Sequence, residues 1–282
     1  MKRDSYVDMR VQGRARLRLY GDSNLSRMIF CHGFEQNEQA FLWRYLRPGD
    51  VFVDVGSNIG LFTIIAAKRV GESGKVFAFE PAAIPRQRLV ENIRLNRFAN
   101  VSVQPMALSN ESGRLEISVP TDGYDAWSSL ATPIEGTNLR IENVEIITWD
   151  EFAALHNGVK PVMMKIDVEG WENRVLNGAT KALSDADAPL LQVEFTDEAA
   201  LSAGSSCALV YQTLLELGYV VCRYDRRSNR LIPEQLRPSY PYENLFATKR
   251  LDVDNQRLMV GSHISYCRLQ MKKYCNAMPH IR

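Results

Sequence analysis

The chain has 282 residues, of which 45% are hydrophobic and 24% charged, so its composition excludes disordered and collagen-like classes. Lys and Arg (34) nearly balance Asp and Glu (33), which disfavours a nucleic acid as the main partner. The five scattered cysteines include no CxxC pair and indicate reduced thiols rather than disulfides or a zinc site. We find no signal-peptide pattern and no apolar run long enough for a membrane span, so the sequence predicts a cytoplasmic protein.

Most of the chain has an alternating pattern of strands and helices. From residue 51 to about residue 248, short β-branched runs alternate with stretches of helical periodicity, as in βαβ units around a parallel sheet. In chain order we expect strand 51–55, helix 60–70, strand 75–80, helix 85–97, strand 101–105, strand 162–168, helix 172–183, strand 190–195 and helix 207–217. The pattern predicts an α/β fold.

The alternation is interrupted in the middle of the chain and changes near its end. Strands 114–119 and 144–148 flank a polar stretch that we expect to be a hairpin-like insertion, followed by a short helix over 149–155. Strands 219–224 and 244–248 close the sheet. Because no helix joins these last two strands, we expect them to be antiparallel neighbours.

The sequence divides into a main domain with two appended segments. Residues 1–46 are predicted to be an N-terminal cap of strand and helix, and residues 251–282 a C-terminal helical extension. Neither segment has enough apolar residues for a core of its own. The main domain is therefore predicted to span residues 47–250.

The turn after the first buried strand is the most informative segment. Residues 54–60 (DVGSNIG) place small residues where a strand meets a helix, which allows a tight bend and the close approach of a ligand. The N–H groups at the helix start favour an anionic group such as a carboxylate. Glu80 ends the second strand, the position from which an acidic side chain binds both ribose hydroxyls. Such a turn also occurs in α/β proteins that bind no nucleoside.

The spacing of this turn disfavours a dinucleotide. The GxGxxG fingerprint is absent from the chain, and Asn58 stands where that fingerprint has the glycine that makes room for a pyrophosphate. The ligand expected is therefore a nucleoside without a pyrophosphate. S-adenosylmethionine, an adenosine joined through a sulfonium to an amino-acid tail, is such a ligand.

Charged residues gather where two later strands end. Lys165, Asp167 and Glu169 alternate at the end of one strand and should share a face, and Glu194 ends the next strand. Ligands of open α/β sheets bind beyond these carboxyl ends. A positioned carboxylate there can take the proton of an attacking hydroxyl, so Asp167 is the first candidate for this role and Glu169 the second. Lys165 would tune either carboxylate.

Two other interpretations of these charges stay open. A buried Lys–carboxylate pair can neutralise itself without any function. Asp167, Glu169 and Glu194 could also bind a hard cation such as Mg²⁺ through their oxygens. Because no His or Asn adjoins Glu194, we expect no metal.

Five motifs, in this order along the chain, resemble the FkbM family of S-adenosylmethionine-dependent methyltransferases. They are DVGSNIG at 54–60, NIRLN at 92–96, ALSNESG at 107–113, SSL at 128–130 and KIDVEG at 165–170. The resemblance extends from about residue 35 to residue 248, and KIDVEG with the following VLNGA at 175–179 is its most specific part. Trp171 departs from the family pattern, which has a small residue there. A bulky indole at this position would reshape the substrate entrance.

The resemblance implies a class I methyltransferase (Rossmann-like) fold with a seven-stranded, mostly parallel sheet, helices on both faces and S-adenosylmethionine as cofactor. The residues expected to bind the cofactor are Asp54, Gly56, Ser57, Asn58, Gly60, Glu80 and Ala107. The residues expected to contact the acceptor are Trp127, Ser128, Ser129, Trp171 and Glu194. The product of such an enzyme is usually O-methylated.

The function predicted is therefore O-methylation of a hydroxyl on a small-molecule, polyketide or carbohydrate-type acceptor. A monomer or homodimer is expected, without nucleic acid. A nicotinamide-dependent dehydrogenase would begin with the same βαβ unit, but this chain lacks the GxGxxG fingerprint of such enzymes. A nucleoside-binding protein without chemistry is the third possibility, because the binding and catalytic residues lie in separate motifs.

Overall fold

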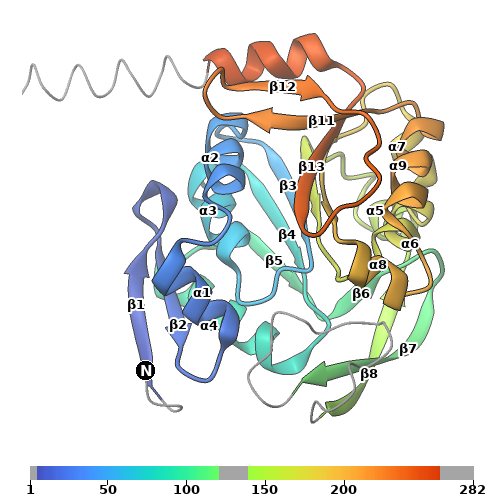
Figure 1. Ribbon diagram of the computed structural model, residues 1–282. Helices are drawn as coiled ribbons and strands as arrows, with labels where there is room; N and C mark the ends of the chain where they lie inside the picture. Colours follow the sequence, from blue (N-terminus) through green and yellow to red (C-terminus); the bar gives the residue numbers. More distant parts are fainter. Residues whose placement is uncertain (1–4, 121–138, 261–282) are drawn as a thin grey trace, which may run out of the picture.

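The computed structural model describes residues 5–120 and 139–260, with an eight-stranded sheet at their centre (Figure 1). The strand order is β12-β11-β13-β10-β9-β3-β4-β5. The bounds are β3 Val51–Val55, β4 Lys75–Phe79, β5 Val101–Gln104, β9 Met163–Ile166, β10 Leu190–Phe195, β11 Val220–Asp225, β12 Arg230–Pro233 and β13 Glu243–Thr248. Strands β10, β9, β3, β4 and β5 are parallel, and β13 is antiparallel to both neighbours. The predicted mostly parallel sheet is confirmed.

The sheet has one strand more than the seven predicted. Strand β12 pairs antiparallel with β11 at the sheet edge, between the strands predicted over 219–224 and 244–248, where no strand was expected. Pro233 fits there because it is the last residue of an edge strand, where a missing N–H costs little. The expected antiparallel pairing of β11 with β13 is confirmed.

Alternate residues of the central strands belong to two hydrophobic cores, one on each face of the sheet. Phe52 and Met163 lie in the first core, while the next residues along, Val53 and Met164, lie in the second. The first core is completed by α2 (Gln36–Tyr45), α3 (Leu61–Val70) and α4 (Ala83–Asn96). The second is completed by α5 (Trp149–Leu155), α6 (Glu172–Asn177), α7 (Thr180–Ser184), α8 (Asp197–Ser202) and α9 (Cys207–Glu216). Helices therefore cover both faces, as predicted.

The N-terminal segment is more elaborate than the strand and helix expected. Strands β1 (Tyr6–Arg10) and β2 (Arg16–Tyr20) form an antiparallel hairpin beside α1 (Asn24–His32) and α2 (Figure 1). Leu17 and Leu19 of β2 are fully buried in the first core of the main sheet. The segment therefore shares its core with the rest of the chain.

The predicted insertion forms part of a second, three-stranded sheet. Strands β7 (Gly113–Pro120) and β8 (Leu139–Ile147) pair antiparallel, which confirms the hairpin-like arrangement. The sequence did not indicate β6 (Met106–Leu108), which pairs parallel with β8. Because the placement of Trp127, Ser128 and Ser129 falls outside the described residues, their predicted role stays a prediction.

The helix predicted over 172–183 is divided into α6 and α7. A Cβ added at Gly178 would overlap the carbonyl oxygen of Ser109, so the glycine lets the segment after β6 approach the helix closely. At the other end of the chain, residues 251–260 are helical, and Asp254 accepts a hydrogen bond from the Tyr45 hydroxyl at 2.6 Å. Among the described residues, no helix combines the length and apolar character that crossing a membrane requires.

Candidate active site

The turn predicted to hold the cofactor presses against the segment that carries the acidic residues. Gly56 has a φ of +81°, and a Cβ added there would overlap the carbonyl oxygen of Asp167. Gly60 also has a positive φ, at the start of α3. These two positions require glycine for conformational and steric reasons, which brings the turn and Asp167 together.

The N–H groups of this turn are used differently from the expectation. Gly56 and Ser57 both donate to the carbonyl oxygen of Phe79, at 3.1 and 3.0 Å, and Asn58 donates to Glu80 Oε2 at 2.8 Å. These three N–H groups therefore fasten the turn to the end of β4. The expectation that the N–H groups at the start of α3 favour an anionic group concerns the residues that follow this turn and stays a prediction.

Glu80 lies at the end of β4, as predicted, and both of its carboxylate oxygens accept backbone N–H groups. Besides the bond from Asn58, Oε1 accepts from the N–H of Ala82 at 2.9 Å. Burial raises the pKa of Glu80 to about 7. The two backbone hydrogen bonds stabilise the anion and therefore oppose this rise. Each oxygen keeps a second lone pair for a ribose hydroxyl.

Asp54 belongs to a row of polar side chains inside the sheet. It pairs in register with Lys165 of β9, which pairs in turn with Gln192 of β10. Asp54 accepts a hydrogen bond from Thr63 of α3, and burial raises its pKa while Lys165 opposes the rise. Asp54 Oδ1 is buried with no partner among the described residues.

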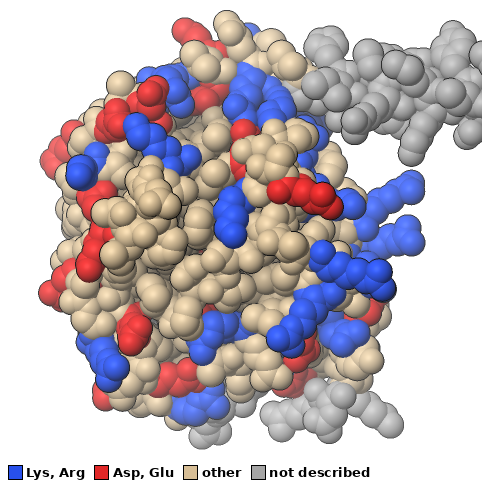
Figure 2. Space-filling view, turned by 180° about the vertical axis from the view of Figure 1, so that it is seen from behind, with Lys and Arg blue, Asp and Glu red and all other residues tan. Residues whose placement is uncertain are grey.

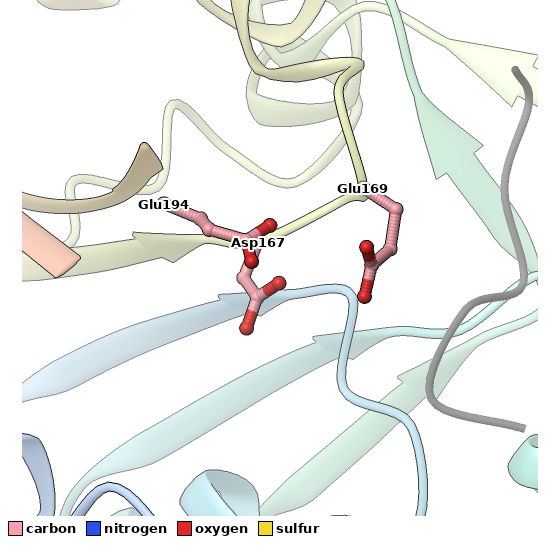
Figure 3. Close-up of side chains that lie close together, drawn as sticks. All are labelled: Asp167, Glu169 and Glu194. Carbon is pink, nitrogen blue, oxygen red and sulfur yellow. The ribbon is translucent and has the colours of Figure 1, made fainter. Parts of the chain in front are cut away.

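The acidic side chains predicted to carry the chemistry lie together. Asp167 and Glu169 follow β9 and Glu194 lies on β10, and all three carboxylates point toward one another, with one oxygen of each within 4.8 Å of the others (Figure 3). Lys165, only 3% exposed, donates to Asp167 Oδ2 at 2.5 Å. Its ammonium also lies 4.9 Å from the ring centre of Phe62. The predicted juxtaposition of the four residues is confirmed as geometry.

This carboxylate cluster, Asp167, Glu169 and Glu194, is electrostatically crowded. Burial, followed by the neighbouring carboxylates, raises the pKa of Glu169 and Glu194 well above the usual range. Protons shared between Glu169 and Glu194 relieve this repulsion, so these two carboxyl groups titrate together. The cluster therefore attracts cationic groups and can exchange protons.

Sequence reasoning missed one acidic residue of the site, Glu35. It lies before α2, where its Oε1 accepts hydrogen bonds from the Tyr242 hydroxyl and from Asn244 Nδ2, the latter at 2.8 Å. Burial raises the pKa of Glu35 to about 7. The positive charge of Lys165 opposes this rise, and the charge of Asp167 adds to it. These partners are about 200 residues away along the chain, so no local pattern could indicate them.

Two other predicted residues, Trp171 and Ala107, are buried. Trp171 is 8% exposed, its indole N–H donates to Ser109 Oγ at 3.2 Å, and the guanidinium of Arg174 covers its ring. Ala107 is buried on β6. The contacts of Trp171 are those of a packed side chain, and its predicted contact with the acceptor stays a prediction.

Residues 54–221 match the sequence model of the Methyltransferase FkbM domain. The chain belongs to the FkbM methyltransferase family. This family membership favours S-adenosylmethionine as the cofactor and a methyltransferase over the dehydrogenase interpretation.

Two named relatives align with much of the chain. The hexuronic acid methyltransferase AglP of Haloferax volcanii is 31% identical over 159 residues, which cover 56% of this chain and 62% of AglP. The 31-O-demethyl-FK506 methyltransferase FkbM of Streptomyces tacrolimicus is 30% identical over 203 residues, covering 62% of this chain and 71% of that protein. The chain thus spans less than two thirds of the length of AglP.

Solved structures of methyltransferases are more distant. An S-adenosylmethionine-dependent O-methyltransferase from Thermotoga maritima has a TM-score of 0.43 and 15% identity, over 86% of this chain and 77% of that one. A precorrin-6y C5,15-methyltransferase from Geobacter metallireducens has a TM-score of 0.42 and 12% identity, over 76% and 89%. The family assignment depends on the sequence match and not on these structures.

Proposed function

We propose that this FkbM-family protein methylates a hydroxyl group of a small-molecule, polyketide or carbohydrate-type acceptor. The observation that carries the proposal is the convergence of Asp167, Glu169 and Glu194 beside the glycine turn. Oxygen acceptors need a proton acceptor, and carboxylates can serve as one. The printed names of the two relatives, which specify a hexuronic acid and a 31-O-demethyl compound, support an oxygen-rich acceptor.

The surface is consistent with a small acceptor. On the face in Figure 2, uncharged residues cover much of the central area around one basic side chain, and further basic side chains gather on the right. Proteins that bind nucleic acid usually carry an excess of basic residues. Over the whole sequence, Lys and Arg (34) only balance Asp and Glu (33), which gives no support for a nucleic acid as acceptor.

The residues present fit the cofactor. When bound, S-adenosylmethionine supplies an activated methyl group on a cationic sulfonium. The carboxylates of the site outnumber Lys165, the cation among them, so the site favours a positively charged ligand. These are the buried Asp54 and Glu194 and the half-buried Asp167 and Glu169. We assign the ribose hydroxyls to Glu80 and the neighbourhood of the methyl group to Asp167.

The side chains of the site would then have different roles toward the acceptor. Asp167 would accept the proton of the acceptor hydroxyl, and the bound cofactor would supply the methyl group that replaces this proton. Lys165 holds the Asp167 carboxylate in place through its 2.5 Å ion pair, and Glu169 and Glu194 orient the acceptor by hydrogen bonds. Alignment of the two reactants contributes alongside proton transfer.

The assignment of Glu80 is tested by replacing it with glutamine. Glu80→Gln keeps the side-chain size but removes the anion, so we expect about a 10- to 100-fold loss of affinity for S-adenosylhomocysteine, the range for a hydrogen bond to a charged group. Isothermal calorimetry measures this affinity directly. Glu72→Gln, at an exposed position, is the matched control and should bind like the wild type. Equal affinities of the two variants would remove Glu80 from the cofactor site.

We further propose that methyl transfer needs no metal. Lys165 already neutralises Asp167, and a sulfonium is activated without a Lewis acid. Turnover should therefore persist after exhaustive chelation with EDTA, measured by transfer of a labelled methyl group. A loss of turnover that Mg²⁺ restores would contradict this and make Asp167, Glu169 and Glu194 metal ligands, as their oxygen chemistry permits.

A further inference from the structure

A cavity of about 470 Å³ lies between the N-terminal helices and the strands β11 and β13. Phe34 and Glu35 line it from the N-terminal segment, and Tyr224, Tyr242 and Asn244 line it from the opposite side. The volume lies in the range of small-molecule sites. None of these five residues was among those predicted to contact the acceptor.

The inner end of the cavity adjoins the carboxylate cluster. Asn244 lies directly opposite Glu194 in the β10–β13 pairing, and it donates to Glu35 Oε1. The other oxygen of that carboxylate, Glu35 Oε2, is buried with no partner among the described residues. A buried acceptor of this kind calls for a hydrogen-bond donor, which a bound hydroxyl can supply.

We propose that this cavity is the acceptor subsite and that it takes an uncharged, hydroxyl-rich ring, such as a neutral sugar, while rejecting one that bears a carboxylate. The inference rests on the proposed function. A hydroxyl held at the inner end, beside Glu35, lies next to the cluster that would take its proton. The aromatic side chains Phe34, Tyr224 and Tyr242 provide apolar surface for the carbon faces of the ring.

The charges around the cavity support this selectivity. Its lining includes the acids Glu35 and Glu38, while the cation Arg223 already pairs with Glu234 at 3.4 Å. Glu243, also in the lining, is held in an ion pair by Arg237. A carboxylate on the acceptor would face Glu35 and Glu38, and Arg223, the cation of the described lining, is already paired with Glu234, so repulsion between like charges would weaken its binding. This chain should therefore differ from a relative that acts on a hexuronic acid.

The test compares ligands that differ only in the charged group. Calorimetry with the full chain, saturated with S-adenosylhomocysteine, measures the affinities of 4-nitrophenyl glucoside and galactoside and of their uronide counterparts. We expect the neutral member of a pair to bind at least about tenfold more tightly than its uronide. Glu35→Gln should shrink this ratio, because it removes a repelling charge, while Glu216→Gln, exposed on α9, should leave it unchanged.

The outcomes separate this inference from the function on which it rests. If S-adenosylhomocysteine does not bind the wild type, the proposed function itself fails. If S-adenosylhomocysteine binds but neither neutral glycoside does, or a uronide binds equally well or better, only the acceptor subsite is overturned. An unchanged ratio in a folded Glu35→Gln variant, checked by its circular dichroism, also overturns it.

Discussion

Asp167→Asn is expected to lower turnover by about 10²- to 10⁴-fold, the usual contribution of a positioned acid or base. The substitution keeps the size of the side chain and most of its hydrogen-bonding capacity but removes the anionic proton acceptor. Affinity for S-adenosylhomocysteine should stay within about threefold of the wild type, since we place Asp167 at the methyl group rather than at the ribose. Single-turnover methyl transfer and calorimetry measure the two quantities separately.

The control for this variant is Asp185→Asn. Asp185 is exposed, and its ion pair with Lys160 lies on the surface, so its replacement should change neither quantity. A collapse of cofactor affinity in Asp167→Asn would instead place Asp167 in the cofactor site and make Glu169 the leading base. Unchanged turnover would mean that catalysis depends on alignment alone.

Gly56→Ala is expected to damage stability and function together. The new methyl group would overlap the carbonyl oxygen of Asp167, so the turn and the end of β9 would have to separate. The left-handed conformation costs about 1–2 kcal/mol for a residue with a Cβ, and overpacking adds about 1–3 kcal/mol. We expect the unfolding free energy, from urea denaturation, to fall by their sum and cofactor affinity to fall with it.

Gly71→Ala isolates the conformational part of this effect. Gly71 also has a positive φ, of +68°, but a Cβ added there meets no atom within 4 Å. Its ψ is −172°, a conformation essentially confined to glycine, so this variant should lose only the roughly 1–3 kcal/mol that such a backbone costs a residue with a Cβ and should keep its cofactor affinity. If both variants lose the same stability and bind the cofactor alike, the close approach of the turn to Asp167 has no consequence.

The strands and helices that the sequence predicted well are those with a strong local signal. Val51–Val55 is apolar apart from one aspartate, and Leu190–Phe195 is apolar apart from Gln192 and Glu194; both are strands with the expected bounds. Met106–Leu108 and Arg230–Pro233 are short strands that owe their conformation to a partner strand, so their own residues carry little signal. The division of helix 172–183 depends on contact with Ser109, which a helical periodicity does not reveal.

The candidate site, like the fold, was predictable only where the signal is local in the sequence. Lys165, Asp167 and Glu169 are neighbours in sequence, and Glu194 ends the adjacent strand, so strand ends alone placed them together. Glu35 was missed because its position depends on how the N-terminal segment folds over β13. The bond from the Trp171 indole N–H to Ser109, which lies 62 residues away, was likewise not visible in the sequence.

The shared core of the N-terminal segment has a consequence for how this protein can be divided. Leu17 and Leu19 fill the main core, and Tyr45 is bonded to Asp254 near the other end of the described chain. A shortened chain that starts at residue 47 would leave the apolar face that these side chains cover open to water, where it would promote aggregation. The segment that borders the cavity therefore cannot be exchanged between enzymes as an independent module.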